Sequence, residues 1–165
     1  MNDDFVRIIR NSVNLSGIKS EVESILSNYP NHPQISLQAP VKHADPDEYW
    51  NCSVGKFKGL DRKEEEYTFP IFTGANLINH YMKSLGMYRT RIMISDPKEC
   101  YTIHKDLSPR IHIPIVSNKD CLMLIGDFNY YLEPGKIYWT DTRQRHTAVN
   151  GSYKRRIHIV GCVES

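Results

Sequence analysis

The spacing of apolar residues changes near Gly86 and divides the chain into a mixed first half and a β-rich second half. In the first half, two stretches carry apolar residues at helical spacing, which indicates helices with one buried face. We expect the first helix to open at residues 16–18 and to end at 29–33. We expect the second to start with Thr73 as N-cap and to stop at Gly86. Their inward residues are Ile18, Val22, Ile25 and Leu26, then Leu77, Ile78, Tyr81, Met82 and Leu85.

Short apolar stretches separated by turn-forming residues predict strands elsewhere in the chain. The predicted strands span residues 5–9, 34–38, 89–94, 100–106, 110–116, 121–125, 136–140, 144–149 and 153–163, the last two joined as a hairpin across Asn150-Gly151. Strands of this length and spacing are typical of a β-sandwich or barrel. We therefore expect a mainly β (α+β) protein with its N-terminal helices packed on one outer face.

Residues 39–70 show no clear period, because prolines, glycines and the charge run 61–66 interrupt the apolar positions. Two interpretations remain open. The segment is either a disordered surface excursion or a lid or binding loop. Its aromatic residues, Tyr49, Trp50, Phe57 and Tyr67, argue against full disorder.

Composition indicates one globular domain over residues 1–165, with an N-terminal part (1–88) and a β core (89–163). Hydrophobic residues make up 40% and charged residues 24%, and the net charge is +2, so charge gives no reason to expect nucleic acid or a membrane surface as partner. The acidic first residues and the lack of a long apolar run lead us to expect a cytoplasmic protein. Its four scattered cysteines are expected to be reduced and mostly buried.

One tetrapeptide occurs twice, as Arg110-Ile-His112-Ile and as Arg156-Ile-His158-Ile. In a strand, the arginine and the histidine share one face and the isoleucines share the other. Arg and His could therefore line the interior of a barrel with Ile packed under the helices, which would suit the binding of an anion. Alternatively, Arg and His face solvent and Ile forms the core. The pattern alone leaves both alternatives open.

The candidate metal ligands are His104 and Asp106, which an extended strand would direct to one face, and His146. Two histidines and one carboxylate, with coordination positions left open, form the ligand set of non-haem Fe(II) oxygenases. A single His-x-acid spacing is weak evidence in a chain with seven His and nineteen Asp plus Glu.

Five motifs together strengthen that evidence: His104-x-Asp106, Arg110-Ile-His112-Ile-Pro-Ile, Gly135-Lys-Ile-Tyr-Trp139, His146-Thr-Ala-Val-Asn150 and Arg156-Ile-His158. In order and approximate spacing they resemble the aspartyl/asparaginyl β-hydroxylase-like branch of the Fe(II)/2-oxoglutarate dioxygenases, which is related to bacterial proline hydroxylases. The resemblance covers roughly residues 89–162. It implies a double-stranded β-helix (jelly roll or cupin barrel), with His104, Asp106 and His146 as metal ligands and catalytic centre.

The resemblance also implies Fe(II) and 2-oxoglutarate as cofactor and co-substrate, with Arg156 binding the far carboxylate of 2-oxoglutarate and Arg110 and His112 near the metal. Turn geometry leaves Arg155 and Arg156 as competitors. A two-residue turn would set Arg155 opposite His146, whereas a longer, bulged loop would set Arg156 on that face. Because the resemblance favours Arg156, we expect the longer loop and an outward Arg155.

The expected reaction is the O2-dependent hydroxylation of an unactivated C–H bond in an amino acid, peptide or other small molecule, with release of succinate and CO2. Two alternatives are a metal-dependent cupin isomerase or dioxygenase that does not use 2-oxoglutarate, and a non-catalytic barrel that binds a small acid through Arg110 and Arg156. Trp139 is expected in the core or in the pocket wall, and Arg143 and Arg145 in solvent or at the barrel mouth. The oligomeric state stays open.

Overall fold

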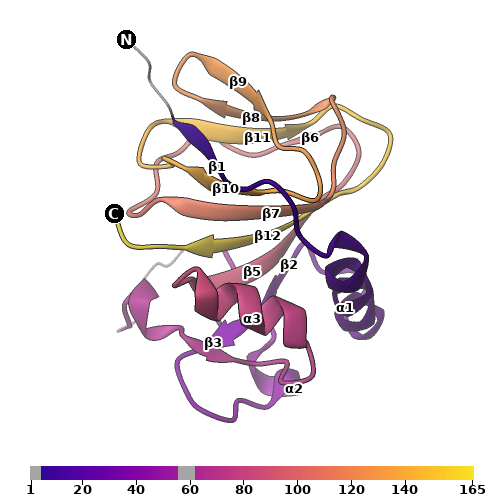
Figure 1. Ribbon diagram of the computed structural model, residues 1–165, viewed down its shortest axis with the longest axis vertical. Helices are drawn as coiled ribbons and strands as arrows, with labels where there is room; N and C mark the ends of the chain where they lie inside the picture. Colours follow the sequence, from indigo (N-terminus) through magenta and orange to yellow (C-terminus); the bar gives the residue numbers. More distant parts are fainter. Residues whose placement is uncertain (1–4, 56–61) are drawn as a thin grey trace.

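Residues 5–55 and 62–165 are described in a computed structural model of the chain (Figure 1). The helices are α1 (Leu15–Asn28), α2 (Pro46–Tyr49) and α3 (Asn76–Ser84), with one 3-10 turn, η1 (Glu64–Glu66). The strands are β1 (Val6–Arg10), β2 (Gln34–Ser36), β3 (Gln38–Ala39), β4 (Phe69–Pro70), β5 (Tyr88–Ser95), β6 (Glu99–Cys100), β7 (Arg110–Val116), β8 (Cys121–Ile125), β9 (Phe128–Tyr131), β10 (Ile137–Thr140), β11 (His146–Asn150) and β12 (Arg156–Cys162).

Two antiparallel sheets face each other, as Figure 1 shows, and buried polar side chains lie between them. The larger sheet has the strand order β1-β10-β7-β12-β5-β2, and the smaller has the order β6-β11-β8-β9. From β5 to β12 the chain alternates between the two sheets, except that β8 and β9 form a hairpin within the smaller one, and this is the winding of a double-stranded β-helix. The predicted fold class is therefore confirmed.

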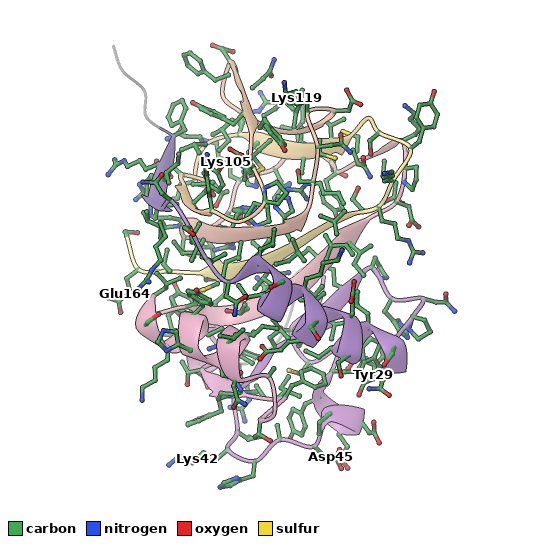
Figure 2. All side chains as sticks on the ribbon, turned by 45° about the vertical axis from the view of Figure 1, so that its right-hand side comes forward. Tyr29, Lys42, Asp45, Lys105, Lys119 and Glu164 are labelled. Carbon is green, nitrogen blue, oxygen red and sulfur yellow. The ribbon has the colours of Figure 1, made fainter. Side chains whose placement is uncertain are left out.

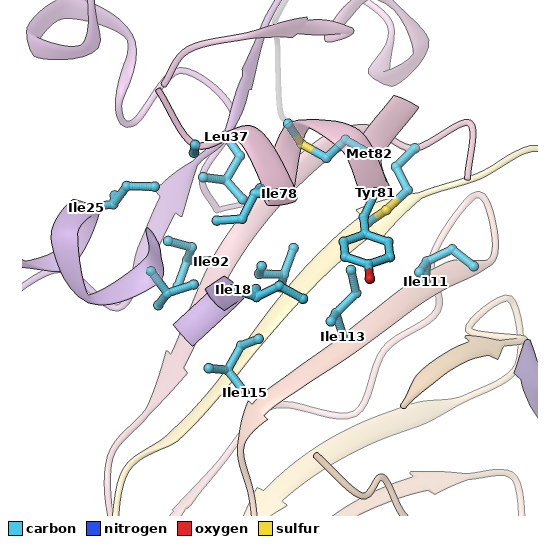
Figure 3. Close-up of a cluster of buried hydrophobic side chains, with 14 of the residues drawn as sticks. Ile18, Ile25, Leu37, Ile78, Tyr81, Met82, Ile92, Ile111, Ile113 and Ile115 are labelled. Atoms are coloured by element: carbon cyan, nitrogen blue, oxygen red, sulfur yellow. The ribbon is translucent and has the colours of Figure 1, made fainter. Parts of the chain in front are cut away.

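The main hydrophobic core lies between the helices and the outer face of the larger sheet (Figure 3). From β7, Ile111, Ile113 and Ile115 point to this side, where they meet Ile18 of α1 and Ile78 of α3. The intervening β7 residues therefore face the barrel interior. This settles the alternatives left by the repeated tetrapeptide: Arg110, His112, Arg156 and His158 are buried inside the barrel.

The predicted hairpin between the last two strands is wrong. β11 pairs with β6 and β8 in the smaller sheet, whereas β12 pairs with β5 and β7 in the larger one. Asn150 holds the connection between the sheets, because its buried amide nitrogen donates to the carbonyls of Ser95, Asp96 and Lys154 at 2.8–3.0 Å. The Asn-Gly pair therefore marks a crossing between sheets and not a tight turn.

Both helix starts also differ from prediction. α1 begins at Leu15, and Asn14 is its N-cap, with a side chain that accepts from the Gly17 amide at 3.0 Å. α3 begins at Asn76, and Thr73 does not cap it. Instead, the Glu21 carboxylate of α1 accepts from the amides of Leu77 and Ile78, both at 2.9 Å. A cap supplied by another helix cannot be found from local spacing.

Three strand predictions need smaller corrections. Residues 34–38 form two short strands, β2 and β3, with a break at Leu37. Only Glu99–Cys100 are in strand near the predicted strand 100–106, apart from an isolated bridge at His104. β9 was not predicted from the sequence, because Phe128–Tyr131 lies so close behind β8 that the polar turn between them is short.

The described part of residues 39–70 lies mostly at the end of the molecule away from the predicted metal ligands. Figure 2 shows Lys42 and Asp45 at the opposite end from Lys105, which lies between two of the predicted ligands. A lid over those ligands therefore does not fit residues 39–50. One residue of the later part, Glu64, does reach the barrel interior. Phe57 and Asp61, named in the sequence analysis, lie outside the described residues.

Candidate metal centre

Backbone pairing with β11 brings the three predicted ligands together. The His104 amide donates to the His146 carbonyl at 3.1 Å, and the reverse bond is 2.9 Å. Two residues later, the Asp106 amide donates to the Thr142 carbonyl at 2.9 Å. The segment is irregular for most of its length, yet it runs beside β11 and directs His104 and Asp106 toward His146.

The side chains of His104, Asp106 and His146 form a compact group in which all possible ligand atoms lie within 4.8 Å of one another. The carboxylate of Asp106 lies 3.9 Å from Nε2 of His104 and 3.5 Å from Nε2 of His146. The His104 side chain is 48% exposed, whereas that of His146 is 5% exposed. The group is therefore open to solvent on the His104 side and closed on the other.

Both histidines have the tautomer that metal binding requires. Nδ1 of His104 lies 2.7 Å from the Thr102 carbonyl, and Nδ1 of His146 lies 3.0 Å from the Gln144 carbonyl. A carbonyl only accepts, so each Nδ1 carries the hydrogen and each Nε2 presents a lone pair. Burial lowers the pKa of His146, although its bond to the Gln144 carbonyl opposes this shift. The neutral ligand form is therefore favoured.

A buried ion-pair network adjoins the predicted metal ligands and includes two residues, Glu64 and Arg89, to which no sequence pattern pointed. Arg110 lies 3.2 Å from Asp106 and 3.5 Å from Glu64 of η1. Arg89 of β5 pairs with the same Glu64 carboxylate. Glu64 stands in a run of charged residues that reads as solvated surface, so nothing in the sequence distinguishes it from Glu65 and Glu66.

A second interior group surrounds Arg156, whose buried positive charge has no carboxylate partner among the described residues. Arg156 is 3% exposed and donates to Nδ1 of His158 at 3.0 Å. Among the described residues no carboxylate pairs with it, and burial lowers its pKa to about 10. A buried guanidinium with only a neutral partner is costly unless a ligand completes its hydrogen bonds.

The two interior histidines carry unused polar atoms beside this arginine. Nδ1 of His112 lies 3.4 Å from Nδ1 of His158, and burial, followed by the charge of Arg156, lowers the pKa of both residues well below 6.5. His158 accepts from Arg156, so its hydrogen lies on Nε2, while the His112 Nδ1 donor leaves a lone pair on its Nε2. Within the described chain neither Nε2 has a hydrogen-bond partner.

The structure separates the remaining predicted residues from the interior. Arg155 is exposed and pairs with Asp96, as expected, although the loop before it is not the predicted bulged hairpin. Trp139 packs on the outer core beside Ile111, which confirms the core interpretation over the pocket wall. Arg143 and Arg145 are exposed, as are His32, His43 and His80. All four cysteines are free, and only Cys121 and Cys162 are buried.

A double-stranded β-helix that directs two imidazoles and one carboxylate to one point is the architecture of a metal-binding cupin-type barrel. The model of the aspartyl/asparaginyl beta-hydroxylase family matches residues 12–164, so the chain belongs to this family. No curated protein matches the sequence.

Several solved structures are similar to this chain, and the first one described below supports the same fold. A 2OG-Fe(II) oxygenase family oxidoreductase from Burkholderia pseudomallei matches with a TM-score of 0.56 and 10% identity, covering 97% of this chain and 84% of that one. A predicted oxalate decarboxylase from Thermotoga maritima has a TM-score of 0.42 and 13% identity, covering 52% and 73% of the two chains. A cupin domain from Bordetella pertussis has a TM-score of 0.41 and 13% identity, covering 47% and 81%.

Within the described residues, no helix has both the length and the apolar character needed to cross a membrane.

Proposed function

We propose that the protein is an Fe(II)- and 2-oxoglutarate-dependent hydroxylase that acts on an unactivated C–H bond of an amino acid, a peptide or another small molecule. The observation that carries the proposal is the convergence of the His104, Asp106 and His146 ligand atoms in a barrel whose interior also holds Arg156, a buried arginine that pairs with no carboxylate among the described residues. Family membership supports the same conclusion.

The three ligands fit Fe(II) by donor type, and burial, which lowers the pKa of His146, favours its neutral ligand form. Two neutral imidazoles and one carboxylate match the ligand set of non-haem Fe(II) oxygenases, which leaves coordination positions for a co-substrate and O2. The Thr102 and Gln144 carbonyls fix the ring orientations, and Arg110 orients Asp106 from 3.2 Å away. When bound, the iron supplies the redox chemistry that couples decarboxylation of 2-oxoglutarate to C–H hydroxylation.

Arg156 would bind the far carboxylate of 2-oxoglutarate, because a planar guanidinium can hold a carboxylate with two parallel hydrogen bonds. The Nε2–H of His158 adds a donor beside it, and Arg110 and His112 lie between this group and the metal ligands. These residues would orient the co-substrate and exclude water from its buried end. The reaction would release succinate and CO2.

Binding of 2-oxoglutarate to the anaerobic Fe(II) protein tests this proposal directly. Adding 2-oxoglutarate should change the absorption spectrum of the wild-type Fe(II) protein, and Arg156→Ala should weaken the response strongly. Arg155→Ala is the matched control, because Arg155 is next to Arg156 in the sequence but its side chain is exposed. The Arg155→Ala protein should respond like wild type. An unchanged wild-type spectrum, or an equal loss in the two variants, would contradict the proposal.

A further inference from the structure

Arg91 of β5 is a buried cation that the proposed reaction does not use. It pairs across the sheet with Val160 of β12, which in turn pairs with His112 of β7. Directly paired residues on neighbouring strands point to the same face, so Arg91 faces the interior on the same side as His112. Strands lie about 4.8 Å apart, so Arg91 and His112 start about 10 Å apart on one face of the sheet. The Arg91 guanidinium extends toward Gln34 of β2. Besides burial, the charges of Arg110 and Asp106 both affect the pKa of Arg91.

The hydrogen bonds of Arg91 are incomplete. Its Nη1 donates to the neutral amide oxygen of Gln34 at 3.1 Å, and no described residue accepts from its Nε. It forms no ion pair within the described part of the chain, and the residue is only 7% exposed. Burial, followed by the charge of Arg89, lowers its pKa to about 10. A buried guanidinium without a negatively charged partner destabilises the fold, and a bound anion would offset this cost.

The barrel interior also has more positive than negative side chains, which favours the binding of an additional anion. Among the described residues, the buried charged side chains are four arginines and one glutamate: Arg89, Arg91, Arg110, Arg156 and Glu64. Asp106 adds one more carboxylate at the metal ligands. Fe(II) and 2-oxoglutarate bring equal and opposite charges, so their binding leaves the excess of positive charge unchanged. A second carboxylic acid would reduce it.

We propose that Arg91 binds a carboxylate of the primary substrate, so that the substrate is a carboxylic acid held beside the metal centre by this group. Arg156 is already assigned to the co-substrate and Arg89 to Glu64, which leaves Arg91 as the interior arginine with only a neutral side-chain partner. The inference rests on the proposed function, because it takes Arg156 and the metal as the site of 2-oxoglutarate.

Thermal unfolding with sodium acetate as the probe tests this assignment without knowledge of the full substrate. The anaerobic Fe(II) protein is first saturated with 2-oxoglutarate and then titrated with acetate or with uncharged acetamide at constant ionic strength. Acetate should raise the Tm and acetamide should not. Arg91→Met should weaken apparent acetate binding by about tenfold or more, the loss expected for a charged hydrogen-bond pair. Arg91→Lys should restore part of it.

Two further readouts separate ligand binding from a structural role. Without ligand, Arg91→Met should have a Tm equal to or above that of wild type, because it removes a buried charge without a counter-ion. Arg155→Met, which changes an exposed arginine, should bind acetate like wild type. The assignment is overturned if acetate acts no differently from acetamide, if Arg91→Met keeps acetate binding, or if Arg91→Met lowers the Tm of the ligand-free protein.

The two proposals fail in different ways. If the proposed function is wrong, 2-oxoglutarate itself will not raise the Tm of the Fe(II) protein. If only the Arg91 assignment is wrong, the 2-oxoglutarate shift will remain, and the difference between acetate and acetamide will be absent or insensitive to Arg91→Met.

Discussion

The Glu64 carboxylate links η1 to the proposed metal centre through Arg110, and its neutralisation should have a large effect. The Glu64, Arg89 and Arg110 side chains are 8%, 6% and 4% exposed, so their interaction is little screened by solvent. Glu64→Gln keeps the shape of the side chain but leaves two buried arginines without their shared carboxylate. Removing one partner of a buried ion pair costs about 3–5 kcal/mol.

That loss of stability should be measured by urea and thermal unfolding of the metal-free protein. In a chain of this length, 1 kcal/mol corresponds to about 2–4 °C, so the Tm of Glu64→Gln should fall by roughly 10 °C. Glu65→Gln is the matched control, because Glu65 is next to Glu64 in the sequence but its side chain is exposed. This substitution should change stability by less than about 0.5 kcal/mol.

Glu64→Gln should also weaken metal binding, by about 10- to 100-fold, the range seen when residues that support metal ligands are changed. The reason is that Arg110 keeps Asp106, 3.2 Å away, as its remaining carboxylate and so competes with the metal for it. Equal stability of Glu64→Gln and Glu65→Gln, or unaltered metal affinity in a folded Glu64→Gln protein, would refute this reasoning.

Three further predictions follow from buried contacts. Burial lowers the pKa values of His112 and His158 in the folded protein. Below the ordinary histidine pKa of about 6.5, the unfolded chain therefore binds more protons than the folded protein does. Stability should therefore fall as the pH decreases from 7 to 5.5 in urea unfolding, and His158→Gln should reduce this loss. Glu21→Ala should cost about 1–2 kcal/mol by uncapping α3, whereas the exposed Glu23→Ala should not exceed about 0.5 kcal/mol in the same assay. Gly161→Ala should lower the thermal stability by about 1–3 kcal/mol, because the added methyl group would lie 2.5 Å from Met87 Cε and Thr90 Oγ1; an unchanged Tm would contradict this packing.

Local patterns predicted the elements whose environment is set by the nearest residues. The alternation of Arg110-Ile-His112-Ile predicts that the isoleucines share one face and the polar residues the other, as the structure has it; that the isoleucines pack against the helices was left open by the pattern. Helical spacing likewise found Ile18 and Ile78 in the core. These predictions succeed because the period of a strand or helix alone decides which side chains share a face.

Features that depend on distant partners could not be predicted in the same way. The Asn150-Gly151 pair suggests a hairpin, but the Asn150 amide bonds to carbonyls near residue 95 and turns the chain into the other sheet. Glu21 caps a helix 56 residues further on. Glu64 and Arg91 join the interior only through the tertiary fold, so their burial has no trace in local composition.

Succinate formation from 2-oxoglutarate tests the central claim most directly. The Fe(II) protein would be reconstituted anaerobically without added substrate and then exposed to O2, and wild type would be compared with His104→Ala and Arg156→Ala. We predict slow succinate formation by the wild-type protein and its loss in both variants, with Arg155→Ala unaffected. Absence of succinate from the wild-type protein, together with an absorption spectrum that 2-oxoglutarate does not change, would contradict the assignment.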